Sequence, residues 1–87
     1  MLPRSAIKSD GIGETCTLDE AARNARVRVL RVSGRPRLIQ RLAALGVVPG
    51  VMLTIVKSRG PSIVSMGGAR IAIGKSAAQS VEIEIAD

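Results

Sequence analysis

No residue of this chain is Phe, Tyr or Trp, so its core must be built from small and mostly branched apolar side chains. Hydrophobic residues still make up 46% of the 87-residue sequence. Valine and isoleucine favour strands, because branching at Cβ restricts a side chain in a helix and packs well on a pleated sheet. A chain of this length supports one domain with one core, and we expect that domain to be mainly β.

The apolar residues recur with the period of a β-strand over much of the chain. Val81, Ile83 and Ile85 alternate with two glutamates, and a similar alternation of arginine and valine slips after Val29. The slip predicts a bulge or a sharp bend at Val29 and Leu30. Five strands are expected, over residues 26–32, 51–56, 63–66, 70–74 and 81–85. Five short antiparallel strands predict a small barrel, which removes exposed sheet edges.

One α-helix is expected between the first two of these strands. Pro36 suits the first turn of a helix, and Leu38, Leu42 and Leu45 recur on one face that we predict to be core. Gly46 follows as a C-terminal cap, and the V-P-G sequence at 48–50 supplies a turn into the next strand. The predicted fold is therefore a small five-stranded antiparallel barrel with one inserted helix and short helical turns.

The domain is expected to begin near Cys16 and to run over residues 16–87. T-L-D-E at 17–20 forms a capping box, which predicts a short helix over 18–22, and residues 75–79 can make one more helical turn. Residues 1–15 hold a proline, two glycines and scattered polar residues with no apolar period. That composition predicts a flexible N-terminal extension.

The residue types that carry most enzyme chemistry are missing. There is no His, so Cys16, the single cysteine, has no histidine base and is expected to be a small buried hydrophobe. Glu82 and Glu84 lie on the solvent side of the last predicted strand, apart from the other carboxylates. No pattern of metal ligands and no phosphate-binding loop is present. The sequence predicts a protein that is not an enzyme and that has no cofactor and no metal site.

The apolar segments are all shorter than the roughly 18 to 20 residues that a membrane-spanning helix needs. The N-terminus has basic residues but no apolar stretch typical of a signal peptide, and one cysteine cannot form an internal disulfide. We therefore expect a cytoplasmic protein that reaches a membrane only through a partner.

The net charge of +6 comes largely from seven arginines between residues 23 and 41, with no acidic residue among them. One hypothesis is an adaptor that docks on an acidic protein through the outer face of the helix and adaptable methionines. The candidate partner-binding residues are Arg37, Gln40, Arg41, Met52 and Met66. For both methionines, core filling is the competing interpretation.

The alternative hypothesis is a basic nucleic-acid-binding barrel that uses the same arginines. The aromatic side chains on which such barrels stack single-stranded bases are absent, which disfavours nucleic acid as the partner. Self-association through an open strand edge is compatible with either hypothesis.

Several segments, taken in order, resemble the FeoA family: T-L-D-E-A at 17–21, A-R-V-R-V-L at 25–30, the helix and turn over 37–50, and the glycine hairpin before R-I-A-I. The resemblance covers all of the chain except the N-terminal extension. Its most specific part is L-G-V-V-P-G at 45–50. One departure lies before the first strand, where a glycine-bearing turn is expected and only Asn24 readily accepts a left-handed backbone.

The resemblance implies an SH3-like barrel and a small cytoplasmic accessory or regulatory protein of bacterial ferrous iron uptake. The implied partner is FeoB, a membrane transporter with a cytoplasmic GTPase domain. The family has no defined catalytic set to carry over to this chain. The same module also forms the C-terminal domain of metal-dependent repressors, but residues 1–15 show no winged-helix pattern, so we expect a free-standing FeoA-like protein.

Overall fold

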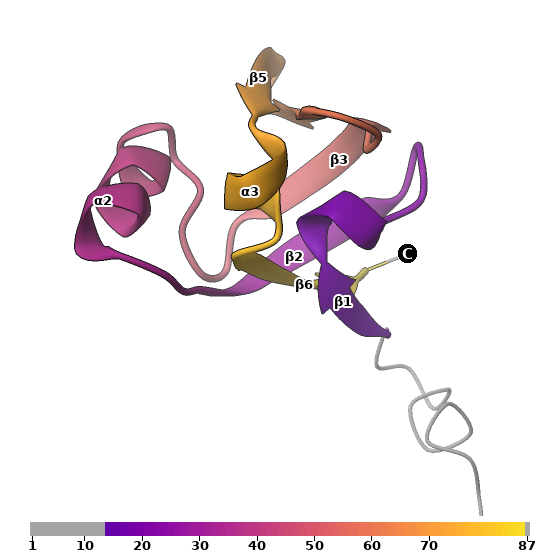
Figure 1. Cartoon of the computed structure of the whole chain (residues 1–87). Coiled ribbons are helices and arrows are strands. Elements are labelled where there is room, and N and C mark those ends of the chain that lie inside the picture. Colours follow the sequence, from indigo (N-terminus) through magenta and orange to yellow (C-terminus); the bar gives the residue numbers. More distant parts are fainter. Residues whose placement is uncertain (1–13, 87) are drawn as a thin grey trace, which may run out of the picture.

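The computed structural model describes residues 14–86, and residues 1–13 of the predicted extension lie outside them (Figure 1). The described chain folds into one antiparallel sheet with the strand order β1-β6-β2-β3-β4-β5. The strands are β1 (Thr15–Thr17), β2 (Arg26–Val32), β3 (Met52–Lys57), β4 (Ser62–Met66), β5 (Ala69–Ile73) and β6 (Val81–Ile85). Strand β3 therefore lies in the interior of the sheet, between β2 and β4.

All five predicted strands are present, but the prediction is one strand short because the structure adds β1. This strand has only three residues, which are too few to show a period-two pattern. It exists because it pairs with β6, with Cys16 opposite Ile83. Such a strand is defined by its partner in the fold and not by its own residues.

Strand β2 bends where the alternation slips. The pairing of β2 with β6 shifts register between Val29 and Arg31, which confirms the predicted bulge. Val27 and Val29 are buried on the inner face, whereas Leu30 is 37% exposed. A bulge increases the local twist of a strand, so it helps this sheet to curve around its core.

Three short helical segments join the strands. They are η1 (Leu18–Glu20), a single turn of 3-10 helix, α2 (Pro36–Ala44) and α3 (Lys75–Ala78). The capping box is confirmed, and the Thr17 amide donates to Oε1 of Glu20 at 3.0 Å. Pro36 begins α2, as predicted. The first helix is shorter than the predicted range 18–22, because the backbone at Ala21 is already extended.

The core lies inside the curved sheet. Its buried apolar residues are Leu18, Ala21, Val27, Val29, Leu42, Val47, Leu53, Ile55, Val64, Ile73, Ala78, Val81 and Ile83. The prediction that Leu45 is core is wrong, because this side chain is 46% exposed. Leu42 is at the centre of the apolar arc of α2, and Leu45 lies about 60° around the helix from it. A helix of nine residues buries the centre of that arc and leaves its flank open.

Candidate functional site

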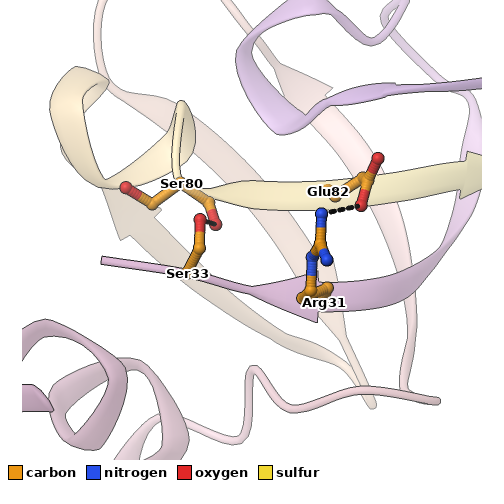
Figure 2. Close-up of polar contacts among 4 residues, drawn as sticks. All are labelled: Arg31, Ser33, Ser80 and Glu82. Carbon is orange, nitrogen blue, oxygen red and sulfur yellow. Dashed lines mark hydrogen bonds and ion pairs between the residues drawn. The ribbon is translucent and has the colours of Figure 1, made fainter. Parts of the chain in front are cut away.

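Five of the seven arginines in the stretch lie on two elements with different surroundings, β2 and α2. On β2, the exposed Arg28 and Arg31 are in register with Glu84 and Glu82 of β6. Nη2 of Arg31 lies 3.4 Å from Oε1 of Glu82 (Figure 2). Because both side chains are largely exposed, this ion pair stabilises the fold by about 1 kcal/mol at most. The pairing matters more for surface charge, because Glu82 and Glu84 of β6 offset the positive charge of Arg28 and Arg31 on the outer face of the sheet.

The end of β2 is fixed to the turn that precedes β6. The Ser33 amide donates to the carbonyl oxygen of Ser80 at 2.9 Å, and the Ser33 hydroxyl donates to the same oxygen at 3.3 Å. Both serines lie beside the ion pair between Arg31 and Glu82 (Figure 2). These bonds hold the two strands in the register that places the opposite charges together.

The arginines of α2 have no such acidic neighbours in their own helix. Arg37, Gln40 and Arg41 are spaced by three and four residues, so they share one face of the helix, and all three are exposed. Of the residues described, none forms an ion pair with either arginine. We call Arg37, Gln40 and Arg41 the basic helix face. The structure therefore brings together these three predicted residues as a positively charged surface.

The two methionines occupy different places. Met52 is half-buried and is the register partner of Arg28, so it belongs to the outer side of the sheet. Met66 packs against the core and lies close to Gly46, just after α2. A Cβ atom placed on Gly46 would lie only 2.7 Å from the terminal methyl of Met66. Met66 therefore fills space beside the helix, and partner binding by either methionine stays a prediction.

A groove separates α2 from β5 and α3. Figure 1 shows that α2 stands apart from the sheet, and a cavity of about 440 Å³ lies between these elements. Its walls include Leu38, Arg41, Leu42 and Leu45 on one side and Ala72, Ile73 and residues 74–77 on the other. Sequence reasoning missed this groove, because its two walls are far apart in the chain and only the fold brings them together.

Another cavity, of about 550 Å³, lies near the turn between β3 and β4. It is lined by Arg23, Lys57 and Arg59 together with Val56, Ser58 and Ile63. None of the predicted site residues lines it. The basic side chains here provide a comparison for those of the basic helix face.

Cys16 is half-buried on β1. Its burial raises the pKa of the thiol, and the neighbouring carboxylates of Glu20, Asp19 and Glu14 raise it further. The thiol is therefore protonated at neutral pH and is a poor nucleophile. Within residues 14–86, no three His, Cys, Asp or Glu side chains are grouped closely enough to hold a metal ion. The helices of the same segment are too short or too polar to cross a membrane.

The fold and this surface define a small, mainly β barrel domain with short helical segments between its strands. A family model described as the FeoA domain matches residues 16–85. The crystal structure of an iron uptake regulatory protein (FeoA) is similar at a TM-score of 0.77 and 32% identity, over 82% of this chain and 97% of that one. The chain belongs to the FeoA family, and this membership gives it a role in ferrous iron transport. The predicted family and fold class are confirmed, but β1 and β5 do not pair among the residues described, so the expected removal of sheet edges is wrong.

Two further structures agree on the fold. The solution structure of a FeoA protein from Chlorobium tepidum is similar at a TM-score of 0.75 and 24% identity, over 83% of this chain and 71% of that one. A manganese-dependent transcriptional repressor is similar at a TM-score of 0.76 and 21% identity, over 84% of this chain and 42% of that one. A search of curated proteins found no match. The repressor shares the SH3-like barrel as one part of a longer chain.

Proposed function

We propose that this chain is a cytoplasmic accessory protein of ferrous iron uptake that acts by binding the cytoplasmic part of a FeoB-type membrane transporter. Membership of the FeoA family is the observation that carries the proposal. The protein would reach the membrane through this partner, and residues 16–87 would form the domain that binds it. The proposed role is to support or regulate transport without catalysis by the chain itself.

The basic helix face supports this role. Its arginines are exposed and have no acidic neighbours in α2, in contrast to Arg28 and Arg31 of β2, which lie opposite the glutamates of β6. A surface with one sign of charge attracts and orients a partner of opposite charge. An acidic region of the transporter is therefore the surface that we expect Arg37 and Arg41 to contact.

The test is a pull-down with the purified chain as bait and the cytoplasmic part of a FeoB-type transporter as prey. At about 150 mM salt, exposed charges are screened beyond roughly 8 Å, so contacts made only through long-range attraction are lost. Wild type should retain the transporter, and Arg37→Ala/Arg41→Ala should lose it. The matched control is Arg23→Ala/Arg59→Ala, which removes the same charge from the other cavity and should retain it. Equal losses in both variants would exclude the basic helix face as the specific contact.

Nucleic acid is the outcome that would overturn the proposal. The chain has no Tyr or Trp, so absorbance at 260 nm of the purified protein reports bound nucleic acid with little background. If wild type retains no transporter and nucleic acid copurifies, the chain is a basic nucleic-acid-binding barrel. Its binding should then weaken steeply with added salt, because phosphate contacts release counterions.

A further inference from the structure

Strand β5 is at the edge of the sheet and pairs only with β4 among the strands described. The hairpin between them has two central residues, Gly67 and Gly68, with φ of +58° and +88°. In this type of turn the flanking residues, here Met66 and Ala69, form a hydrogen-bonded pair. Hydrogen-bonded positions then alternate along β5, so Arg70 and Ala72 direct their backbone N–H and C=O groups away from β4. Within residues 14–86, the N–H and C=O groups of Arg70 and Ala72 therefore have no backbone partner at the outer edge of β5.

The groove described above reaches this edge at the end of β5. Consecutive residues of a strand point to opposite faces of the sheet. The cavity is nevertheless lined by both Ala72, which is exposed, and Ile73, which is buried. Ala72 and Ile73 are the last two residues of β5 and the only ones of this strand that line the cavity, so the cavity meets β5 at its C-terminal end, on the side that β4 does not cover. The opposite wall of the groove is helix α2.

The walls of the groove are apolar with a basic rim. Leu38 of α2 is half-buried, and Leu45, directly after α2, is exposed. Both line the cavity together with Ile73 of β5. Arg41 and Lys75 are the charged residues of its lining, and no carboxylate lines it. This combination suits a ligand that has apolar groups on one side and negative charge on the other.

We propose that this groove binds an extended acidic peptide segment, which adds to β5 as a further strand. Backbone groups of the segment pair with those of Arg70 and Ala72. Its apolar side chains, at every second position, enter the groove against Leu38 and Leu45, and its carboxylates lie near Arg41 and Lys75. This proposal rests on the proposed function for one point, that the partner is a protein. It adds that the partner binds through an extended acidic segment.

A second copy of this chain is a poor occupant of the same edge. Two antiparallel copies of β5 would bring Arg70 of each copy close to that of the other, beside two further basic residues of each groove. Like charges directly opposite each other destabilise a strand pair. The same charges favour an acidic strand from a different protein.

The test uses a synthetic acidic peptide, acetyl-E-V-E-I-E-V-amide, added to the full-length chain and followed by NMR. The Arg70 and Ala72 amides should shift and become protected from hydrogen exchange on binding. Methylating the peptide nitrogens along one edge should weaken binding by about tenfold or more, because two hydrogen bonds to β5 are lost. Methylating the nitrogens of the other edge should have little effect. A peptide with lysine in place of each glutamate should not bind.

A variant test locates the apolar contact. Leu45→Asn should weaken peptide binding about tenfold, because it removes an apolar wall of the groove. Val48→Asn is the matched control, because Val48 is 40% exposed, close to the 46% of Leu45, and does not line the groove. Equal effects of both variants, or of both methylated peptides, would overturn the proposal. So would a concentration-dependent dimer whose interface protects the same two amides in the absence of peptide.

The result of the pull-down is separate from this test. If the transporter is retained but the peptide does not bind, the groove proposal is wrong and the proposed function stands. If the peptide binds as expected but the transporter is not retained, the groove proposal stands and a different acidic protein is the partner.

Discussion

Alanine substitution at two glycines of L-G-V-V-P-G provides a test of how this motif works. Gly46 and Gly50 have almost the same φ, +96° and +95°. An L-residue is strained there, at a cost of about 1–3 kcal/mol. The same substitution also removes freedom from the unfolded chain, which offsets part of that cost equally at both positions. Gly46→Ala and Gly50→Ala should therefore lower the free energy of unfolding by similar amounts as far as the backbone is concerned.

The two positions differ in what a new Cβ would meet. At Gly46 it would lie 2.7 Å from the terminal methyl and 3.5 Å from the sulfur of Met66, whereas nothing lies within 4 Å at Gly50. The end of a methionine side chain can rotate away, at a cost of about 0.5–1.5 kcal/mol if it leaves its preferred rotamer. Gly46→Ala should therefore be less stable than Gly50→Ala by about that amount.

The free energy of unfolding is best measured by urea titration followed by far-UV circular dichroism, because the chain has no Trp or Tyr for fluorescence. In a domain of this size, 1 kcal/mol corresponds to about 4–8 °C in Tm, so thermal melts provide a second measurement. The extra loss at Gly46 should vanish in a Met66→Ala background. If it persists there, or if the two alanine variants are equally stable in the wild-type background, the contact with Met66 is not its cause. A Gly50→Ala variant as stable as wild type would refute the backbone argument.

Three further predictions use the same purified chain. Asn24 has φ of +71° at the position where the family resemblance led us to expect glycine. In urea titrations, Asn24→Gly should change the free energy of unfolding by no more than about 0.5 kcal/mol, whereas Asn24→Ala should lower it by about 1 kcal/mol. Equal losses in both variants would contradict a left-handed turn at this residue. Ser62 is fully buried and its hydroxyl has no hydrogen-bond partner among the residues described, so Ser62→Ala should gain about 1 kcal/mol, and a loss would reveal a partner. Because the pKa of the Cys16 thiol is raised, Cys16 should react with a disulfide reagent more slowly in the folded chain than in urea, and the pH at which its reaction rate rises should be higher. Glu20→Gln should lower that pH only part of the way to the value in urea, because burial is the larger cause of the raised pKa. Since the folded pKa is the higher one, stability is unaffected below the pKa of the unfolded thiol and falls as pH rises from that value through the folded pKa.

Local patterns in the sequence predicted most of the secondary structure. The alternation of Val81, Ile83 and Ile85 gave β6, and the phase slip after Val29 gave the bulge of β2. Such features are readable because side chains alternate in a strand, so one face of each strand must be apolar. The start of α2 was equally readable, because Pro36 has the fixed φ of a first helical turn.

The site could be predicted only in part. The spacing of Arg37, Gln40 and Arg41 indicated a shared exposed face, and the structure has them on one. The sequence did not indicate that Arg28 and Arg31 of β2 lie opposite the glutamates of β6. That pairing depends on which strands become neighbours, and β2 and β6 are separated by most of the chain. The difference between a balanced sheet face and an unbalanced helix face is therefore a tertiary property.

The β-rich fold of the FeoA type can be predicted from the sequence, since strand alternation, helix start and glycine turns are local and each is specified by a few adjacent residues. Packing between distant segments set the remaining features. It made a strand of Thr15–Thr17 by placing β6 beside it, and it left Leu45 exposed because α2 buries only the centre of its apolar arc. It also formed the groove, because a cavity needs two walls and the distance between α2 and the free edge of β5 is set by the packing of the whole core.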